Sequence, residues 1–282
     1  MPTNSGHVPT LPRDRNPHSV HASHHHRQIA ESFGSDAERY DRARPRYPQA
    51  LVDRISAVSP GPDVLDVGCG TGIVARQFEA AGYRVLGIDV DARMAELAGQ
   101  RGLDVEVASF EAWDPAGRRF DAVVSGQTWH WVDPVAGAGK AAETLRPRGV
   151  LALFWNAGQP VPEVAEAFAE VYRRVIPDSL AARQQAVSAV DGYGALCAKA
   201  AEGIRQVDAF ADPERWRFDW ERSYTRDEWL DQLPTQGAFT RLARSELEEV
   251  LAGVGAAIDG AGGSFTMHYA TVAVAATRTD TA

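Results

Sequence analysis

The sequence predicts an α/β fold built on a doubly wound, mostly parallel sheet. Five short apolar runs alternate with helical segments between residues 64 and 155, and the first run leads directly into a glycine-rich turn. Parallel strands need crossover connections, so this alternation is expected to cover both faces of the sheet with helices. Ligands of such sheets bind outside the carboxyl ends of the strands, and we expect the chemistry there.

Hydrophobic spacing and turn residues define the order of the elements. Two helices come first, one started by a capping-box pattern at 35–38 and ended by Pro45, the other over 48–58. Parallel strands are expected at 64–67, 84–89, 105–107, 120–125 and 150–155, with helices between them at 73–81, 93–100 and 135–145. A mostly helical insertion at about 162–208 precedes a strand at 216–224, helices at 226–233 and 245–259, and an antiparallel closing strand at 268–276.

The resulting expectation is a seven-stranded sheet within one domain over residues 28–282. We expect the insertion at about 162–208 to form a lid over the pocket, because segments at that edge can vary without disturbing the sheet. Residues 1–27 hold six of the eight histidines and almost no apolar side chains, which predicts a disordered tail. No metal site is expected there, since the histidines lack acidic or cysteine partners on a fixed scaffold.

Composition narrows the class of partner. The formal net charge of −9, without a basic stripe, disfavours a nucleic-acid substrate. Cys69 and Cys197 have no paired spacing, which is typical of a reducing compartment. No apolar run approaches the roughly 18 residues of a membrane span, and no secretion signal begins the chain. We therefore expect a cytoplasmic protein that acts on a small molecule, as a monomer or a homodimer.

The glycine-rich turn carries the functional prediction. In residues 64–72, VLDVGCGTG, an apolar strand runs into three glycines that permit positive φ and close approach of a ligand. A pyrophosphate cradle would need its third glycine at Ile73, so the spacing fits a dinucleotide poorly. Asp66 would repel a pyrophosphate but suits a ligand that carries an ammonium group. Asp89, at the end of the next strand, is placed to accept hydrogen bonds from a ribose.

These motifs resemble those of a known enzyme family. Residues 64–72 are similar to motif I of class I S-adenosylmethionine-dependent methyltransferases, and residues 87–91, GIDVD, to the acidic second motif. Residues 40–48, YDRARPRYP, resemble the N-terminal segment of methyltransferase type 11 enzymes related to trans-aconitate methyltransferase. The resemblance implies a Rossmann-like fold, S-adenosylmethionine as cofactor and S-adenosylhomocysteine as product.

The resemblance also implies which residues bind the cofactor. Gly68, Gly70 and Gly72 would contact the methionine part, Asp89 the ribose, and Tyr40 and Arg44 would close over the ligand. The family often has an aspartate after the third strand, where this chain has Ser109 and Phe110 for hydrogen bonding to and stacking on the adenine. The complete expected set is Tyr40, Arg44, Asp66, Gly68, Cys69, Gly70, Gly72, Asp89, Val90, Ser109, Phe110, Ser125 and Gln127.

Aromatic residues and His130 follow the fourth strand and suggest the acceptor side. His130 is a candidate general base, but packing between Trp129 and Trp131 with hydrogen bonds only to backbone is the more common role of a lone histidine. Trp129, Trp131 and Trp155 are candidates for the acceptor pocket, and Trp155 could instead fill the core. A carboxylate acceptor needs no base, because it is ionised at neutral pH, whereas an alcohol or phenol does.

Two other functions remain open at this point. One is a protein that binds S-adenosylmethionine without catalysis, and the other is a nicotinamide-dependent oxidoreductase. The glycine spacing and Asp66 both disfavour the oxidoreductase. Carboxylate or hydroxyl O-methylation of a small molecule is the expected reaction.

Overall fold

A computed structural model describes residues 34, 36–179, 181–182 and 189–280. The predicted tail at 1–27 lies outside these residues, as does Ser35 of the predicted capping box. The first helix begins one residue later than that pattern suggests, at Ala37. Asp36 caps it, because its carboxylate accepts a hydrogen bond from the Arg39 backbone N–H at 3.0 Å.

One seven-stranded sheet forms the centre of the molecule, with strand order β3-β2-β1-β4-β5-β7-β6. The first five strands in the chain run parallel to one another, while β7 runs antiparallel to both β5 and β6. The predicted fold class is therefore confirmed. The bounds are β1 Asp63–Val67, β2 Arg84–Asp89, β3 Asp104–Val107, β4 Phe120–Gly126, β5 Leu145–Pro160, β6 Glu214–Thr225 and β7 Ser264–Thr277.

Helices cover both faces of the sheet. Apolar side chains of α3 and α4 pack against one face, and those of α6 and α9 pack against the other. The helix bounds are α2 Ala37–Ala43, α3 Gln49–Val58, α4 Ile73–Ala80, α5 Ala92–Gln100, α6 Pro134–Thr144, α7 Pro162–Val175, α9 Ala189–Arg205, α10 Arg226–Gln232 and α11 Arg244–Gly260. Short 3₁₀ turns lie at η2 Phe110–Ala112, η3 Trp129–Trp131 and η4 Leu233–Thr235. None of the described helices combines the length and apolar composition that a membrane crossing needs.

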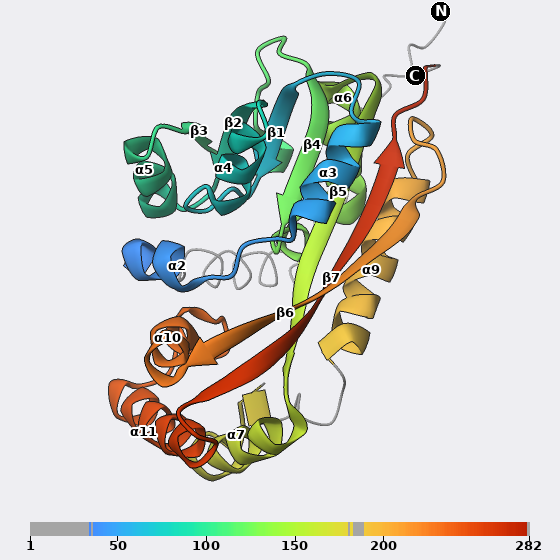
Figure 1. The fold of residues 1–282 in the computed structure, drawn as a ribbon. Helices are drawn as coiled ribbons and strands as arrows, with labels where there is room; N and C mark the ends of the chain where they lie inside the picture. Colours follow the sequence, from blue (N-terminus) through green and yellow to red (C-terminus); the bar gives the residue numbers. More distant parts are fainter. Residues whose placement is uncertain (1–33, 35, 180, 183–188, 281–282) are drawn as a thin grey trace, which may run out of the picture.

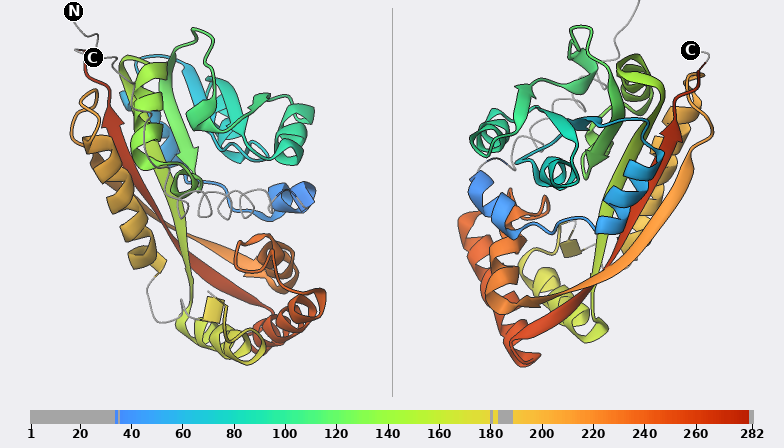
Figure 2. Two further views of the ribbon diagram at one scale, coloured as in Figure 1. Left: turned by 180° about the vertical axis from the view of Figure 1, so that it is seen from behind. Right: turned by 45° about the horizontal axis from the view of Figure 1, so that its top comes forward.

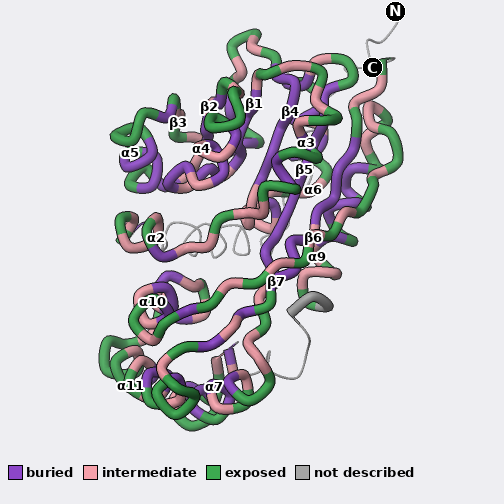
Figure 3. Tube along the Cα trace, in the orientation of Figure 1, coloured by how far each residue is buried: buried purple, intermediate pink, exposed green. Residues whose placement is uncertain are grey.

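A ribbon of three long strands connects the parallel sheet to a second helical cluster. β5 pairs with β4 as far as Phe154 and then continues against β7 alone from Trp155 to Pro160. Figures 1 and 2 show β5, β7 and β6 sweeping from the glycine-loop half of the molecule to α7, α10 and α11. The buried residues of those three helices and of the distal strand ends form a separate apolar core. Figure 3 shows buried residues continuing along β5 past the end of β4, and beyond that point β5 pairs with β7 alone.

Two features differ from what the sequence suggested. β5 is much longer than the expected strand at 150–155, because its pairing with β7 continues to Pro160 and Leu145 already pairs with Phe120 of β4. The insertion at about 162–208 is divided: α7 packs on α11 in the second core, whereas α9 packs on α6 beside the sheet. Residues 180 and 183–188 of this insertion lie outside the described part.

Candidate functional site

The glycine loop follows β1 and needs glycine for two separate reasons. Gly68, Gly70 and Gly72 have φ values of +68°, +54° and +83°, a region that other L-residues rarely adopt. A Cβ on Gly68 would lie 2.0 Å from the Cγ2 of Thr128, whereas a Cβ on Gly70 would meet nothing within 4 Å. The loop is held against β2 because the backbone N–H groups of Gly68 and Cys69 both donate to the Ile88 carbonyl, at 2.7 and 3.0 Å.

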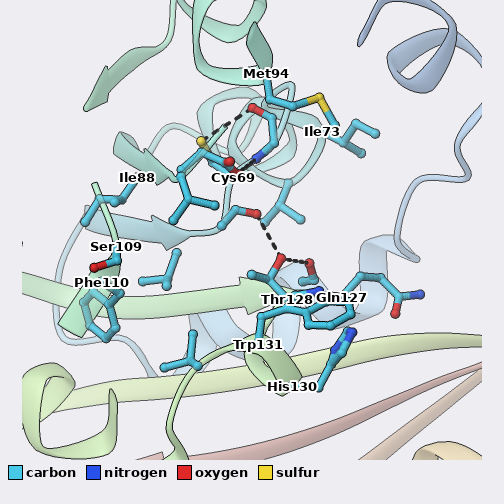
Figure 4. A pocket seen from close by; sticks show the side chains of 18 of the residues that line it. Cys69, Ile73, Ile88, Met94, Ser109, Phe110, Gln127, Thr128, His130 and Trp131 are labelled. Carbon is cyan, nitrogen blue, oxygen red and sulfur yellow. Dashed lines mark hydrogen bonds between the residues drawn. The ribbon is translucent and has the colours of Figure 1, made fainter. Parts of the chain in front are cut away.

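A cavity of about 570 Å³ opens beside this loop, at the carboxyl ends of β1, β2 and β4. The order of the sheet reverses between β1 and β4, which is where ligands of doubly wound folds bind. Figure 4 shows Ser109 and Phe110 on one side of it, and Gln127, His130 and Trp131 across from Met94. The predicted site residues that line it are Tyr40, Arg44, Gly68, Cys69, Gly70, Asp89, Val90, Ser109, Phe110, Gln127, His130 and Trp131.

The other five predicted residues lie behind the cavity wall. Gly72 is the N-cap of α4, and Ser125 is fully buried with its Oγ donating to the Val67 carbonyl at 2.9 Å. Trp129 is buried against Phe110, with 6.0 Å between the ring centroids. Trp155 is also in the core, where its Nε1 donates to His130 Nδ1 at 3.3 Å. Asp66, the fifth, is fully buried at the end of β1.

Asp66 and Asp89 place two carboxyl groups beside the glycine loop. Neither oxygen of Asp66 has a hydrogen-bond partner. Burial raises the pKa of Asp66 to about 8, with a further contribution from the negative charge of Asp89. Asp89 accepts hydrogen bonds from the backbone N–H groups of Gly70, at 2.7 Å, and Asp91, at 2.8 Å. The glycine loop and Asp89 are therefore joined by hydrogen bonds. The buried carboxyl of Asp66 lies next to them without a hydrogen-bond partner.

The N-terminal segment borders the cavity from the side of α2. The Arg44 guanidinium lies 4.8 Å from the centroid of the Tyr40 ring, and its Nη2 donates to the Thr235 carbonyl at 2.7 Å. The Arg44 Nε is buried and has no hydrogen-bond partner. Figure 1 shows α2 between α5 and α10, so this segment lies between the two halves of the molecule.

Several lining residues were not among the predicted site residues. Those with polar or sulfur-containing side chains each come from a different element or loop: Tyr47, Met94, Glu111, Thr128, Asp133, Asn156 and Lys199. Tyr47 belongs to the 40–48 segment, and Asn156 follows the expected fifth strand, so their positions carried a signal. Lys199 lies within α9 and had none, because only packing brings that helix to the cavity. Among the described residues, no cluster of His, Cys, Asp and Glu could hold a metal ion.

Comparison with known proteins establishes the family. The sequence model of the methyltransferase domain family matches residues 40–189, which include the glycine loop and most of the cavity lining. The chain belongs to this methyltransferase family. The identification of a class I methyltransferase from motifs at 64–72 and 87–91 is thus confirmed, while the likeness to trans-aconitate enzymes stays a prediction.

Individual relatives of this chain agree with that assignment. An uncharacterised methyltransferase of Mycobacterium tuberculosis is 35% identical over 133 residues, covering 46% of this chain and 54% of the relative. The chain thus spans about half the length of that curated relative. A malonyl-[acyl-carrier protein] O-methyltransferase of Enterobacter lignolyticus is 32% identical over 170 residues, covering 58% of this chain and 67% of the relative.

One solved structure shares the fold of this chain over most of its length. It is a protein of Anaeromyxobacter dehalogenans proposed to be a type II methyltransferase, and it superposes with a TM-score of 0.59. The two sequences are 23% identical, and the match covers 82% of this chain and 97% of the other. At this identity the comparison establishes the fold.

Proposed function

We propose that this protein is an S-adenosylmethionine-dependent methyltransferase that methylates an oxygen atom of a small-molecule acceptor. The observation that carries the proposal is the cavity at the β1/β4 switch point, lined by a glycine loop and by Asp89 and backed by the unpartnered carboxyl of Asp66. A buried carboxyl without a partner fits a ligand that brings its own positive charge. The name of the Enterobacter relative, an O-methyltransferase, supports oxygen as the methylated atom.

The described residues fit this cofactor in three parts. Gly70 leaves open space for the methionine portion, with Asp66 as the nearby countercharge for its ammonium group. Asp89 would accept hydrogen bonds from the ribose, and Ser109 and Phe110 line the wall where the adenine would lie. When bound, the cofactor supplies an electrophilic methyl group on a sulfonium. The protein then contributes alignment of the acceptor and exclusion of water.

The acceptor would enter from the other side of the cavity. Gln127, Trp131 and Asn156 line that side, and Asn156 is held in place because its Oδ1 accepts from Thr271 Oγ1 at 2.6 Å. Gln127 has a φ of +58°, and its Nε2 donates to the backbone carbonyl of Asn156 at 3.1 Å, which fixes the Gln127 side chain against β5. A non-glycine residue in this conformation is strained, as is common at ligand sites.

The proposal is tested by a matched pair of glycine variants. Gly70 and Gly117 both have positive φ, and an added Cβ meets nothing within 4 Å at either position, but only Gly70 lines the cavity. We expect the wild-type protein to bind S-adenosylmethionine in calorimetry, Gly70→Ala to weaken binding by about tenfold or more, and Gly117→Ala to match the wild type, since a tenfold loss needs only about 1.4 kcal/mol. Equal binding by all three proteins would contradict the site.

Catalysis is tested separately from binding. Release of S-adenosylhomocysteine in the presence of an acceptor that is methylated on oxygen supports the proposed methyltransferase activity. Binding of S-adenosylmethionine without turnover on any acceptor would favour a non-catalytic binding protein. A change in NADH fluorescence when the wild-type protein is added, together with no heat of binding from S-adenosylmethionine, would instead favour a nicotinamide-dependent enzyme.

A further inference from the structure

One edge of the sheet is formed by a long and regular strand. β6 is the last strand of the sheet, and in the part of the chain that the structure describes it pairs only with β7 (Figure 2). Its 12 residues pair with β7 without a bulge and include no proline or glycine. Proteins usually protect such an edge from pairing by shortening or bulging the strand, or by placing proline or charged residues on it. Of these devices, β6 has only the charges.

The two faces of β6 differ in character. Side chains of Trp216, Phe218 and Trp220 pack against the apolar cores on one face. On the other face the alternate side chains are exposed, and the first four of them are charged: Arg215, Arg217, Asp219 and Glu221. Two positive charges therefore precede Phe218, and two negative charges follow it.

A second copy of β6, running antiparallel, complements this pattern. A two-fold axis through Phe218, perpendicular to the sheet, places residues equally far before and after position 218 opposite each other. Each resulting pair joins opposite charges or two indoles: Glu214 with Arg222, Arg215 with Glu221, Trp216 with Trp220, and Arg217 with Asp219. Each pair occurs twice, because the axis relates the two copies. Cross-strand pairs of these kinds stabilise antiparallel sheets.

Neighbouring registers lack this complementarity. A two-fold axis keeps each face of the sheet on the same side, so the axis must pass through a residue and not between two residues. Centring the pairing on Arg217 places that arginine opposite itself, and centring it on Asp219 places that carboxylate opposite itself. Like charges directly opposite each other destabilise a sheet. Charges that only protected the edge would not need this order, so the order favours self-pairing.

The ion pairs that these residues make within one chain do not oppose an exchange of partners. Arg217 pairs with Asp219 at 2.9 Å, but the two side chains are 56% and 66% exposed. Glu214 and Glu221 lie 3.7 Å from Arg54 and 3.6 Å from His268, also at the surface. Exposed pairs of this kind contribute little stability. Replacing them by equivalent pairs between two copies therefore costs little.

We propose that the protein forms a homodimer in which the two β6 strands pair antiparallel about Phe218 and join the two sheets into one. The partner that this edge fits is thus a second copy of the chain. No residue of β6 lines the cavity beside the glycine loop. The dimer therefore does not depend on the proposed function.

Charge reversal tests the pairing by analytical ultracentrifugation. We expect the wild type to sediment as a dimer. Arg217→Asp and Asp219→Arg should each self-associate at least tenfold more weakly, because both contacts between positions 217 and 219 become repulsive. An equal mixture of the two variants should form a heterodimer, in which opposite charges face each other again. The double variant, Arg217→Asp with Asp219→Arg, should form a dimer by itself for the same reason.

Arg244→Asp is the matched control for these variants. It makes the same change of charge and also removes an exposed ion pair, the one between Arg244 and Glu248 at 2.8 Å on α11. It should form a dimer as the wild type does. A monomeric wild type, single variants that associate as tightly as the wild type, or a mixture that stays monomeric would each overturn the proposal.

The register is tested by oxidative cross-linking of single cysteines. Position 218 faces itself in the proposed dimer, with a Cα separation of about 4.5–5.5 Å, which a disulfide accepts. Phe218→Cys should therefore give a covalent dimer. Ser223→Cys should not, since position 223 faces position 213. Cys69 and Cys197 are buried, and the wild type gives the background.

Cross-linking at position 223 without cross-linking at position 218 would overturn the register. Arg217→Asp should bind S-adenosylmethionine as the wild type does, because Arg217 lies outside the cavity lining. Failure of the wild type itself to bind this ligand would refute the proposed function, while sedimentation would still decide the dimer.

Discussion

Asp66 shows how one buried group can link ligand binding to stability. It lies at the end of a central strand, with no exposed surface and no hydrogen-bond partner for either oxygen. The unfolded chain releases its proton near the ordinary pKa of 3.8, while burial raises the pKa in the folded protein to about 8. Between these values the folded state holds a proton that the unfolded state has lost. The stability of the ligand-free protein therefore falls as the pH rises through this range.

We expect Asp66→Asn to remove this pH dependence. The amide cannot ionise, so the melting temperature of the variant relative to the wild type should rise steadily from pH 5 to pH 8. Thermal unfolding followed by circular dichroism at several pH values measures the difference. Asp53→Asn, on the exposed face of α3, is the control. Its melting temperature should differ from that of the wild type by the same amount at every pH. A constant difference between Asp66→Asn and the wild type would show that Asp66 is already ionised.

At the scale of elements, the short helix α2 ties the two halves of the molecule together. On one side Asp41 pairs with Arg76, at 2.5 Å, and with Arg101. On the other side Arg39 and Arg42 both pair with Asp231 of α10, at 3.0 and 2.9 Å. The helix carries Tyr40 and leads directly to Arg44, which both line the cavity. Ion pairs of this kind contribute little to stability singly, but here they set the position of a cavity wall.

Asp231→Ala should weaken cofactor binding more than it weakens the fold. Loss of both arginine contacts frees α2 on the side of α10, and we expect S-adenosylmethionine affinity to fall about fivefold, or roughly 1 kcal/mol. Calorimetry of the variant gives the affinity, and thermal unfolding shows that the fold is kept. Asp227→Ala is the matched control on the same helix, since Asp227 pairs with Arg226 and its side chain is 92% exposed. Affinities that are equal in both variants would show that α2 does not cover the ligand.

The whole molecule depends on strands that run through two apolar cores. β6 pairs with β7 along its whole length, and the side chains of these two strands contribute both to a sheet core and to the distal core. In the distal core the Phe168 ring stacks on Trp229, with centroids 6.1 Å apart, and meets Phe265 edge-on at 5.5 Å. Because the strands are continuous, we expect both halves to unfold in one cooperative transition.

Phe168→Ala tests this organisation. The cavity left in the distal core should cost about 3–5 kcal/mol of unfolding free energy. Affinity for S-adenosylmethionine should remain near the wild-type value, because Phe168 belongs to the core that lies away from the glycine loop. Phe78→Ala, on α4 directly after the loop, should cost a similar amount and also weaken binding. Denaturant unfolding with two separate transitions in either variant would contradict a single cooperative unit.

The spacing of apolar residues and the short motifs in the sequence were enough to predict the sheet architecture and the family. Strand and helix periodicity, the glycines after β1 and the carboxylate that ends β2 act over a few residues, so the alternation and the loop could be predicted from neighbours in the chain. Local pattern could not predict the full length of β5, because its distal half is extended by pairing with β7, more than a hundred residues later.

Tertiary packing decided which predicted residues reach the cavity. A period of two shows that Ser125 and Trp155 point away from their chain neighbours, but not whether that face meets the core or a ligand. Contacts with Val67 and His130 place both in the interior. The same packing leaves Asp66 without a partner, brings Lys199 to the wall and places the Trp155 indole against His130. These properties arise between segments far apart in the chain, where side-chain contacts and burial, rather than local propensity, determine the chemistry.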